Sequence, residues 1–324
     1  MPRVTRRSLL ASGAALAAAA CGPESPPLPA DRRPPRSRVG VFAASYGAEL
    51  SSVVLRGLRE LAVNTTGARV VLKPNLVEFD PNGVINTHPA LIAAAADAFL
   101  SAGAREVTIA EGPGHRRDNE YLLVASGLDA LLREKRLRYV DLNFDRVVRT
   151  RLASRFSDLG ELYLPATVME ADLFVSMPKL KTHHWAGVTL SMKNLFGVVP
   201  GSVYGWPKNP LHWAGIDASI VDLASTIPAR RFAIVDGVVG MQGNGPIQGD
   251  RIDVGAIVMG EDFVAVDATC CQLMGLDPAR VRHIEAAGAF LGNADPQKHV
   301  HLGEELVRFR REFTLLPQWE ALRG

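Results

Sequence analysis

Short apolar runs alternate with longer amphipathic segments from Val39 onward. The short runs are typical of buried strands and the longer ones of helices, and this alternation predicts an α/β fold with a largely parallel sheet flanked by helices. The strands expected are residues 39–44, 69–73, 106–110, 138–142, 173–177, 232–235 and 254–259. The helices expected are residues 49–62, 89–102, 121–135, 213–226, 264–274 and 278–290.

Residues 145–165 do not follow the alternation, and we expect a hairpin excursion or a smaller lobe there. The whole pattern suits one large α/β domain over residues 39–316 of the 324-residue chain, with residues 317–324 as a tail. No apolar run reaches the roughly 20 residues that a membrane-spanning helix needs.

The N-terminus has the pattern of an export signal. Thr5-Arg6-Arg7-Ser8-Leu9-Leu10 precedes an alanine-rich stretch, which predicts a twin-arginine signal over residues 1–21 and a periplasmic or membrane-surface location. Cys21 lies where a lipoprotein signal is cut and lipidated, so we expect a membrane contact through lipid. The proline-rich residues 22–38 are predicted to be a linker.

Five expected strands run into a charged residue or a Gly/Pro loop. The five junctions are Lys73-Pro74-Asn75, Glu111-Gly112-Pro113-Gly114, Pro178-Lys179, Asp236-Gly237 and Gly260-Glu261-Asp262. Ligands bind at the carboxyl ends of strands in open parallel sheets, so these junctions predict one shared site.

Cation usage changes around this expected site. The chain has 7 lysines and 29 arginines, yet residues 156–229 contain no arginine and four lysines: Lys179, Lys181, Lys193 and Lys208. Lysine is a compact point charge that suits anionic oxygens and can lose its proton when desolvated, whereas arginine stays charged. The segment therefore favours an anion site, the alternative being ordinary solvated loop lysines. A net charge of +2 without a basic stripe indicates no nucleic-acid partner.

Two adjacent histidines, His183 and His184, follow the lysines. Neighbouring side chains project in different directions, so we expect one of them to transfer a proton and the other to pack. An alternative is a metal held by His88, His212, one of the two adjacent histidines and a carboxylate such as Glu111 or Asp236, a set that matches no standard spacing. The chain contains three cysteines, which excludes an intrinsic four-cysteine iron–sulfur cluster.

An ordered series of motifs resembles the DUF362 domain family. The series consists of Lys73-Pro74-Asn75-Leu76, Thr87-His88-Pro89, Gly103-Ala104, Glu111-Gly112, Ala171-Asp172, Pro178-Lys179-Leu180-Lys181-Thr182-His183, Lys193-Asn194-Leu195-Phe196-Gly197, Asp236-Gly237, Gly243-Asn244-Gly245-Pro246 and Ala265-Val266-Asp267. The resemblance implies that the shared Lys, His, Asn and Asp residues form a common site. Many members look like iron–sulfur proteins with a ferredoxin-type cysteine module, which this chain lacks. The overall layout is also similar to the lactate racemase family, an analogy that would imply a lysine-tethered nickel cofactor.

The leading hypothesis is an enzyme or cofactor-holding protein with a Lys/His anion site, its cofactor unknown. The alternatives are a periplasmic lipoprotein that binds an anionic small molecule without catalysis, and a scaffold for a membrane redox complex. The residues expected to carry chemistry are His183, Lys181, Lys193 and Asp236. Those expected to hold the ligand or cofactor are Lys73, Asn75, Glu111, Lys179, Asn194, Gly243 and Gly245.

Overall fold

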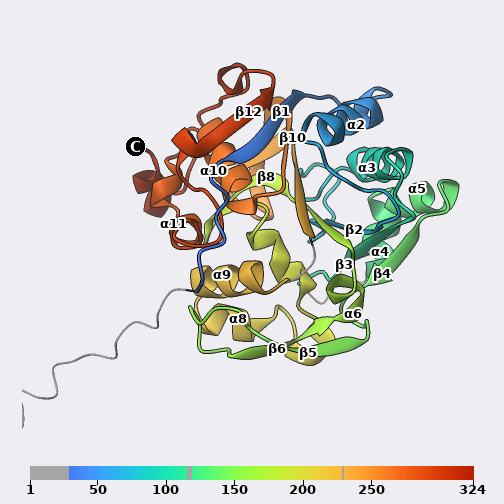
Figure 1. Ribbon diagram of the computed structural model, residues 1–324, viewed down its shortest axis with the longest axis horizontal. Helices are drawn as coiled ribbons and strands as arrows, with labels where there is room; N and C mark the ends of the chain where they lie inside the picture. The colour runs from blue at the N-terminus through green and yellow to red at the C-terminus, as the bar shows by residue number, and fades with distance from the viewer. Residues whose placement is uncertain (1–28, 115–118, 228–229) are drawn as a thin grey trace, which may run out of the picture.

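A ten-stranded sheet forms the centre of the protein (Figure 1), seen in a computed structural model that describes residues 29–114, 119–227 and 230–324. The strands of the main sheet are β1 (Ser37–Ala43), β2 (Arg69–Pro74), β3 (Glu106–Glu111), β4 (Arg138–Asp141), β7 (Leu173–Met177), β8 (Lys179–His183), β9 (Gly187–Thr189), β10 (Arg230–Asn244), β11 (Gln248–Gly260) and β12 (His299–Gly303). Their order is β12-β1-β11-β10-β7-β2-β3-β4, with β8 paired to β10 and β9 to β8. Most neighbours are parallel, which confirms the predicted fold class.

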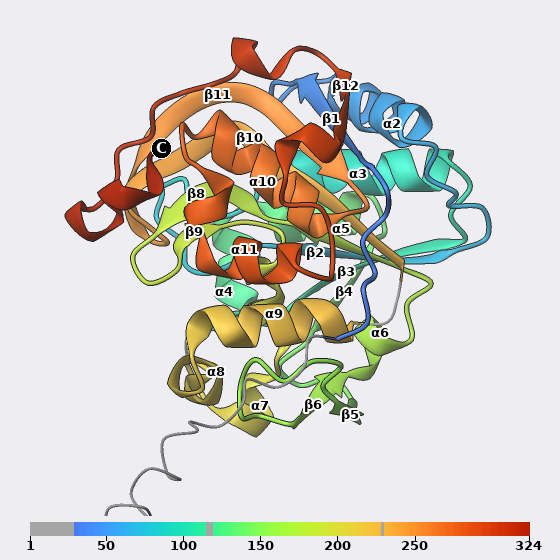
Figure 2. The same cartoon turned by 60° about the vertical axis from the view of Figure 1, so that its left-hand side comes forward.

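Helices cover both faces of this sheet. The helices of the described chain are α2 (Leu50–Glu60), α3 (Pro89–Ser101), α4 (Asn119–Ala125), α5 (Leu128–Glu134), α6 (Ala166–Met169), α7 (Gly201–Tyr204), α8 (Asn209–Trp213), α9 (Ile216–Thr226), α10 (Phe263–Leu273) and α11 (Arg282–Gly288). Five 3-10 helices complete the set: η1 (Lys193–Val198), η2 (Pro278–Arg280), η3 (Pro296–Lys298), η4 (Leu306–Arg308) and η5 (Pro317–Leu322). Helices α2, α3 and α5 bury one face, and α9, α10, α11 and η1 bury the other (Figures 1 and 2).

Helix α3 begins where the sequence predicts. Pro89 occupies its first turn, and Nδ1 of the capping His88 accepts a hydrogen bond from Ala90 N at 3.2 Å. A proline at this position costs the helix no hydrogen bond, because the first N–H groups of a helix have no partner within it. The helix therefore starts immediately after His88, and the hydroxyl of the preceding Thr87 accepts from Asn75 N in the loop that follows β2.

The predicted excursion over residues 145–165 is confirmed as a hairpin. Strands β5 (Val147–Arg151) and β6 (Glu161–Pro165) pair in antiparallel fashion as a separate small sheet. Two other predictions were too simple. The helix expected over residues 121–135 is two helices, because Gly127 adopts φ +76° between α4 and α5. The helix expected over residues 278–290 is divided into η2 and α11 at Val281, which is extended.

The strand junction at Gly260-Glu261-Asp262 was assigned to the wrong edge. Strands β10 and β11 form one long antiparallel pair, so β11 ends at the edge opposite to the end of β10. Figure 2 shows the two strands curving together around α10. Asp262 caps α10 instead, accepting bonds from Val264 N and Ala265 N at 3.0 and 3.2 Å.

Residues near both ends of the described chain contact the α/β domain. In the predicted linker, Arg32 N donates to Phe290 O at 2.7 Å, so this segment already lies on the domain. In the predicted tail, η5 packs Leu322 into the core, and Trp319 Nε1 donates to His184 O at 3.0 Å. The predicted signal at residues 1–21 and Cys21 lie outside the described residues. Within those residues, no helix has both the length and the apolar character needed to cross a membrane.

Candidate functional site

A cavity of about 210 Å³ lies where β2 and β3 end and where the chain passes through β8, β9 and η1. Seven of the predicted site residues line it: Lys73, Asn75, Glu111, Lys181, His183, Lys193 and Asn194. Residues up to 121 positions apart in sequence are bonded across this site, which is the convergence that a parallel sheet edge produces. We refer to this cavity as the strand-end pocket.

A buried ion pair forms one wall of the strand-end pocket. Lys73 Nζ lies 2.8 Å from Glu111 Oε2 and 3.1 Å from Asn194 Oδ1, and it also donates to the carbonyl of Pro74 at 2.9 Å. Burial lowers the pKa of Lys73, although Glu111 opposes the shift. Gly197 is required beside the pair, because a Cβ atom there would lie 2.1 Å from Glu111 Oε1 and 2.5 Å from Lys73 Nζ.

Lys181 and Lys208 are both fully buried and have no carboxylate partner among the described residues. Lys181 Nζ donates to Ile85 O at 2.8 Å and to Pro246 O at 3.2 Å. Burial, together with Lys179 and Lys193, lowers the pKa of Lys181 well below its usual value. Buried ammonium groups without a counter-ion are costly, so a negatively charged ligand would offset a real penalty here.

Lys208 is held by three backbone carbonyls. Its Nζ donates to Gly112 O at 2.6 Å, Phe196 O at 3.1 Å and Gly197 O at 3.4 Å. These bonds use all three N–H groups of an ammonium and join the loop that follows β3 to the 3-10 helix η1. Burial lowers the pKa of Lys208 to about 7, against the opposing effect of Glu111.

Lys193 begins η1 and is the least constrained lysine of the strand-end pocket. Its Nζ lies 3.9 Å from the centroid of the Phe196 ring. In the described part of the chain, it forms neither a hydrogen bond nor an ion pair. Burial, followed by the charge of Lys73, lowers the pKa of Lys193 to about 7. A substantial fraction of this amine is therefore unprotonated at neutral pH.

Both adjacent histidines line the strand-end pocket, although the sequence predicted that only one would. Their ring centroids lie 5.0 Å apart. His183 is buried, and its Nδ1 accepts hydrogen bonds from Trp185 N at 3.0 Å and Ala186 N at 3.2 Å. His184 is half-buried, and its Nδ1 donates to Gly245 O at 2.8 Å, because a carbonyl can only accept. The two rings consequently hold their protons on different nitrogens.

Two buried polar atoms of the strand-end pocket lack partners within the described residues. They are Asn75 Oδ1 and Thr189 Oγ1. Nearly all buried polar atoms in native proteins are hydrogen-bonded, so an exception at a cavity wall points to a ligand or water that completes the bond. Thr189 gave no signal in the sequence, since a single threonine in a short strand is unremarkable.

Lys179 and Asp236 lie outside the strand-end pocket, contrary to the prediction of one shared site. They form their own buried pair, with Lys179 Nζ 2.8 Å from Asp236 Oδ2. Tyr46 OH donates to Asp236 Oδ1 at 2.7 Å, and His88 N donates to Oδ2 at 2.9 Å. Asp236 is already satisfied by these groups and sits within β10 instead of at its end. This cluster is a structural support beside the pocket.

Gly243 and Gly245 also lie outside the set of residues that line the strand-end pocket. Their carbonyls act indirectly, since Gly243 O accepts from the Thr182 hydroxyl at 2.8 Å and Gly245 O accepts from His184. A Cβ atom on Gly245 would lie 2.0 Å from Thr182 O, so glycine is needed for this close approach. The loop that contains these glycines therefore holds β8 in position, and the next two residues, Pro246 and Ile247, line the pocket.

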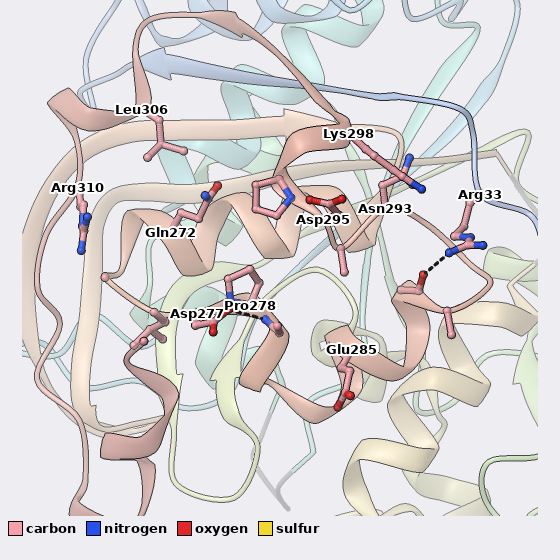
Figure 3. A pocket seen from close by; sticks show the side chains of 18 residues that line it. Arg33, Gln272, Asp277, Pro278, Glu285, Asn293, Asp295, Lys298, Leu306 and Arg310 are labelled. Atoms are coloured by element: carbon pink, nitrogen blue, oxygen red, sulfur yellow. Dashed lines mark hydrogen bonds between the residues drawn. The ribbon is translucent and has the colours of Figure 1, made fainter.

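The structure also contains a larger cavity of about 810 Å³ that shares no lining residue with the strand-end pocket (Figure 3). It is lined from α10, η2, α11 and the segment leading to β12, with Gln272, Asp277, Glu285, Lys298 and Arg310 among its residues. Its charges are mixed and exposed, and it contains none of the predicted site residues. Among the described residues, no three His, Cys, Asp or Glu side chains lie close enough together to hold a metal ion.

Lys208 was absent from the predicted site residues, although a signal for it existed. It is one of the four lysines in the arginine-free stretch, and that stretch supplies Lys181 and Lys193 as well. Lys208 was not predicted to belong to the site because it lies beyond the expected strands. In the structure it reaches the site because η1 and α8 fold over the end of β3.

The protein is thus an α/β protein with a pocket at the strand ends of its sheet that is lined by lysine and histidine side chains. The chain belongs to the DUF362 family, a domain of unknown function whose model matches residues 70–272. The chain is 32% identical over 222 residues to the thylakoid-associated protein sll1697 of Synechocystis, a match that covers 66% of this chain and 65% of that protein, which is less than two thirds of its length.

Two solved structures are also similar. One is a Thermotoga maritima protein, at 15% identity and a TM-score of 0.40, covering 72% of this chain and 60% of that one. The other is the lactate racemase apoprotein of Thermoanaerobacterium thermosaccharolyticum, at 18% identity and a TM-score of 0.42, covering 77% of this chain and 59% of that one. Likeness at this level leaves the nickel analogy as an untested prediction.

Proposed function

We propose that this protein is an enzyme that binds a small carboxylate- or phosphate-bearing molecule in the strand-end pocket and transfers a proton to or from it. The observation that carries this proposal is the imbalance of charge-bearing groups: four lysine amines face the single carboxylate of Glu111 around a cavity of about 210 Å³. Ligand pockets commonly measure about 300–1,000 Å³, so this one favours a small metabolite over a nucleotide.

Lys181 supports the anion-binding part of the proposal. Its two bonds to carbonyls leave one N–H of the ammonium for a ligand. An anion beside it would also stabilise the charged form that burial disfavours, so binding would offset part of the desolvation cost of the ammonium. Asn75 Oδ1 and Thr189 Oγ1 supply polar contacts that would orient the ligand.

The hydrogen bonds of the two histidines support proton transfer and suggest distinct roles. His183 Nδ1 accepts two backbone N–H groups, so its proton sits on Nε2, and burial lowers its pKa well below the usual value. It acts as a neutral hydrogen-bond donor. His184 donates from Nδ1, which leaves Nε2 as the basic atom. We therefore assign general base catalysis to His184.

The N-terminal pattern supports a place of action outside the cytoplasm. We propose twin-arginine export followed by lipid attachment at Cys21, because the two signals adjoin in the sequence. A protein exported already folded can carry a finished site, which suits an enzyme better than a simple binding protein.

The anion site is tested with Lys181→Met, which removes the ammonium and keeps much of the side-chain volume. Binding of oxalate and inorganic phosphate is measured by calorimetry for the full mature chain. We expect a loss of about tenfold to a hundredfold in affinity, the range for hydrogen bonds to charged groups. Lys298→Met at the larger cavity is the matched control and should bind as the unmodified protein does. Equal binding by both variants, or a loss confined to Lys298→Met, would contradict the proposal.

A further inference from the structure

The four lysines of the strand-end pocket differ in what holds them. Lys73 is paired with Glu111, and Lys181 and Lys208 donate to two and three backbone carbonyls, respectively. Within the described residues, only Lys193 lacks such partners, and it contacts the face of Phe196. Three amines are therefore fixed as donors, while the fourth keeps its nitrogen available to a ligand.

We propose that the Lys193 amine condenses with the carbonyl group of a small carboxylate or phosphate that also carries an aldehyde or ketone. This inference rests on the proposed function and narrows its substrate class to oxo anions. The amine must lose its proton to become a nucleophile, and two features favour this loss: a desolvated position and a neighbouring cation, Lys73.

The surroundings of Lys193 suit this reaction. His183 lies close enough for the Lys193 charge to lower the pKa of its ring, and its Nε2–H is a donor for a carbonyl oxygen. Lys181 holds the anionic end of the ligand with its remaining N–H. The Phe196 ring lies 3.9 Å from the Lys193 nitrogen and covers one side of it with an apolar face.

The chemistry balances without an outside oxidant or reductant. The nitrogen lone pair attacks the carbonyl carbon to form a C–N bond, and a proton passes from nitrogen to oxygen to give a carbinolamine. The hydroxyl then leaves as water with one proton taken from solvent through a histidine, which leaves a protonated imine. Addition of water reverses these steps and releases the ligand. The positive imine acidifies the neighbouring C–H, and His184 Nε2 is the basic atom that removes this proton.

Reductive trapping tests the inference. The full mature protein is incubated with pyruvate, glyoxylate or glycolaldehyde phosphate and with cyanoborohydride, then examined by intact mass and peptide mapping. We expect one reduced adduct per protein, located on Lys193. The total amount of adduct should be at least tenfold lower in Lys193→Arg, because arginine keeps a positive charge but offers no nucleophile. Lys298→Arg is the control and should form the full adduct. The choice among the three probes separates carboxylate from phosphate recognition.

Oxalate, an anion without an aldehyde or ketone, separates this inference from the proposed function. If the unmodified protein binds oxalate but none of the three carbonyl probes gives an adduct on Lys193, the inference is overturned and the anion site still stands. A failure of oxalate, inorganic phosphate and all three probes to bind would overturn both. An adduct found on Lys181, Lys208 or Lys298 instead would also overturn it. The thermal midpoint of Lys193→Arg is compared with that of the unmodified protein, so that a folding defect is recognised.

Discussion

At the scale of single residues, the two adjacent histidines show how backbone contacts decide chemistry. His183 and His184 are the same side chain at neighbouring positions, yet one ring accepts at Nδ1 and the other donates from it. The sequence could predict that a histidine would act here, but the tautomers depend on the turn after β8 and on the carbonyl of Gly245. These contacts arise only when distant segments meet.

This difference predicts opposite outcomes for one substitution made at each position. An asparagine oxygen can replace an accepting Nδ1, and an asparagine N–H can replace a donating one, so both variants should fold. His184→Asn removes the basic Nε2 and should slow exchange of the pyruvate methyl hydrogens in D₂O by about 10²-fold or more, the typical contribution of a general base. His183→Asn should retain this exchange to a greater degree. Exchange is followed by proton NMR, and a larger loss in His183→Asn would refute the assignment.

At the scale of elements, the sequence predicted the interior better than the edges. Strands β2, β3 and β7 were placed within a residue or two, because buried strands read as apolar runs. The error at Gly260-Glu261-Asp262 arose because an apolar run shows no direction, and an antiparallel strand looks the same as a parallel one. Lys179 and Asp236 were joined to the site for a similar reason. Their mutual pairing is set by the register of β8 against β10, which no local pattern contains.

The position of η1 predicts a stability effect at Asp267. This buried carboxylate on α10 accepts from Ser191 N at 2.7 Å and Met192 N at 3.0 Å, so it fixes the turn that delivers Lys193. Asp267→Asn loses one accepting oxygen and should lower the free energy of unfolding by about 1–3 kcal/mol, the cost of an unsatisfied buried group. Urea titration measures this, with Asp295→Asn, at an exposed position, as the control.

The difference in free energy of unfolding between Asp267→Asn and the unmodified protein should depend on pH. Burial raises the pKa of Asp267 to about 7 in the folded state, from 3.8. The folded protein therefore holds this proton more tightly, and the associated stability is present below pH 4 and lost as the pH rises through 7. Asparagine does not titrate, so the deficit of Asp267→Asn should shrink between pH 5 and pH 8. A deficit that is constant or grows over this range would contradict the assigned role of burial.

At the scale of the whole molecule, the site depends on a core stable enough to hold four lysine amines against the single carboxylate of Glu111. Both faces of the sheet are packed with apolar side chains, and beside the strand ends Lys73, Lys181 and Lys208 are fully buried while Lys193 is partly buried. A protein without a use for these charges would gain stability by replacing them with apolar residues. The lysine-for-arginine switch in the sequence records this arrangement, since arginine could not shed its proton there.

This arrangement predicts how anion affinity varies with pH. Lys193 and Lys208 have folded-state pKa values of about 7, below the usual 10.5. Above pH 7 these amines are therefore largely unprotonated in the empty pocket, whereas a bound anion stabilises their protonated forms. Binding should then take up protons, and the dissociation constant for oxalate should rise by up to roughly tenfold per pH unit for each proton taken up between pH 7 and 9. Below pH 6, both amines are already charged, and the affinity should level off. Calorimetry in buffers of different ionisation enthalpy counts the protons directly.

Lys193→Arg should remove the Lys193 share of this uptake, because arginine stays protonated throughout, whereas Lys298→Arg should leave it unchanged. An affinity for oxalate that is flat from pH 6 to 9 would mean that these amines do not face the ligand, since no other description of the pocket couples their protons to its charge.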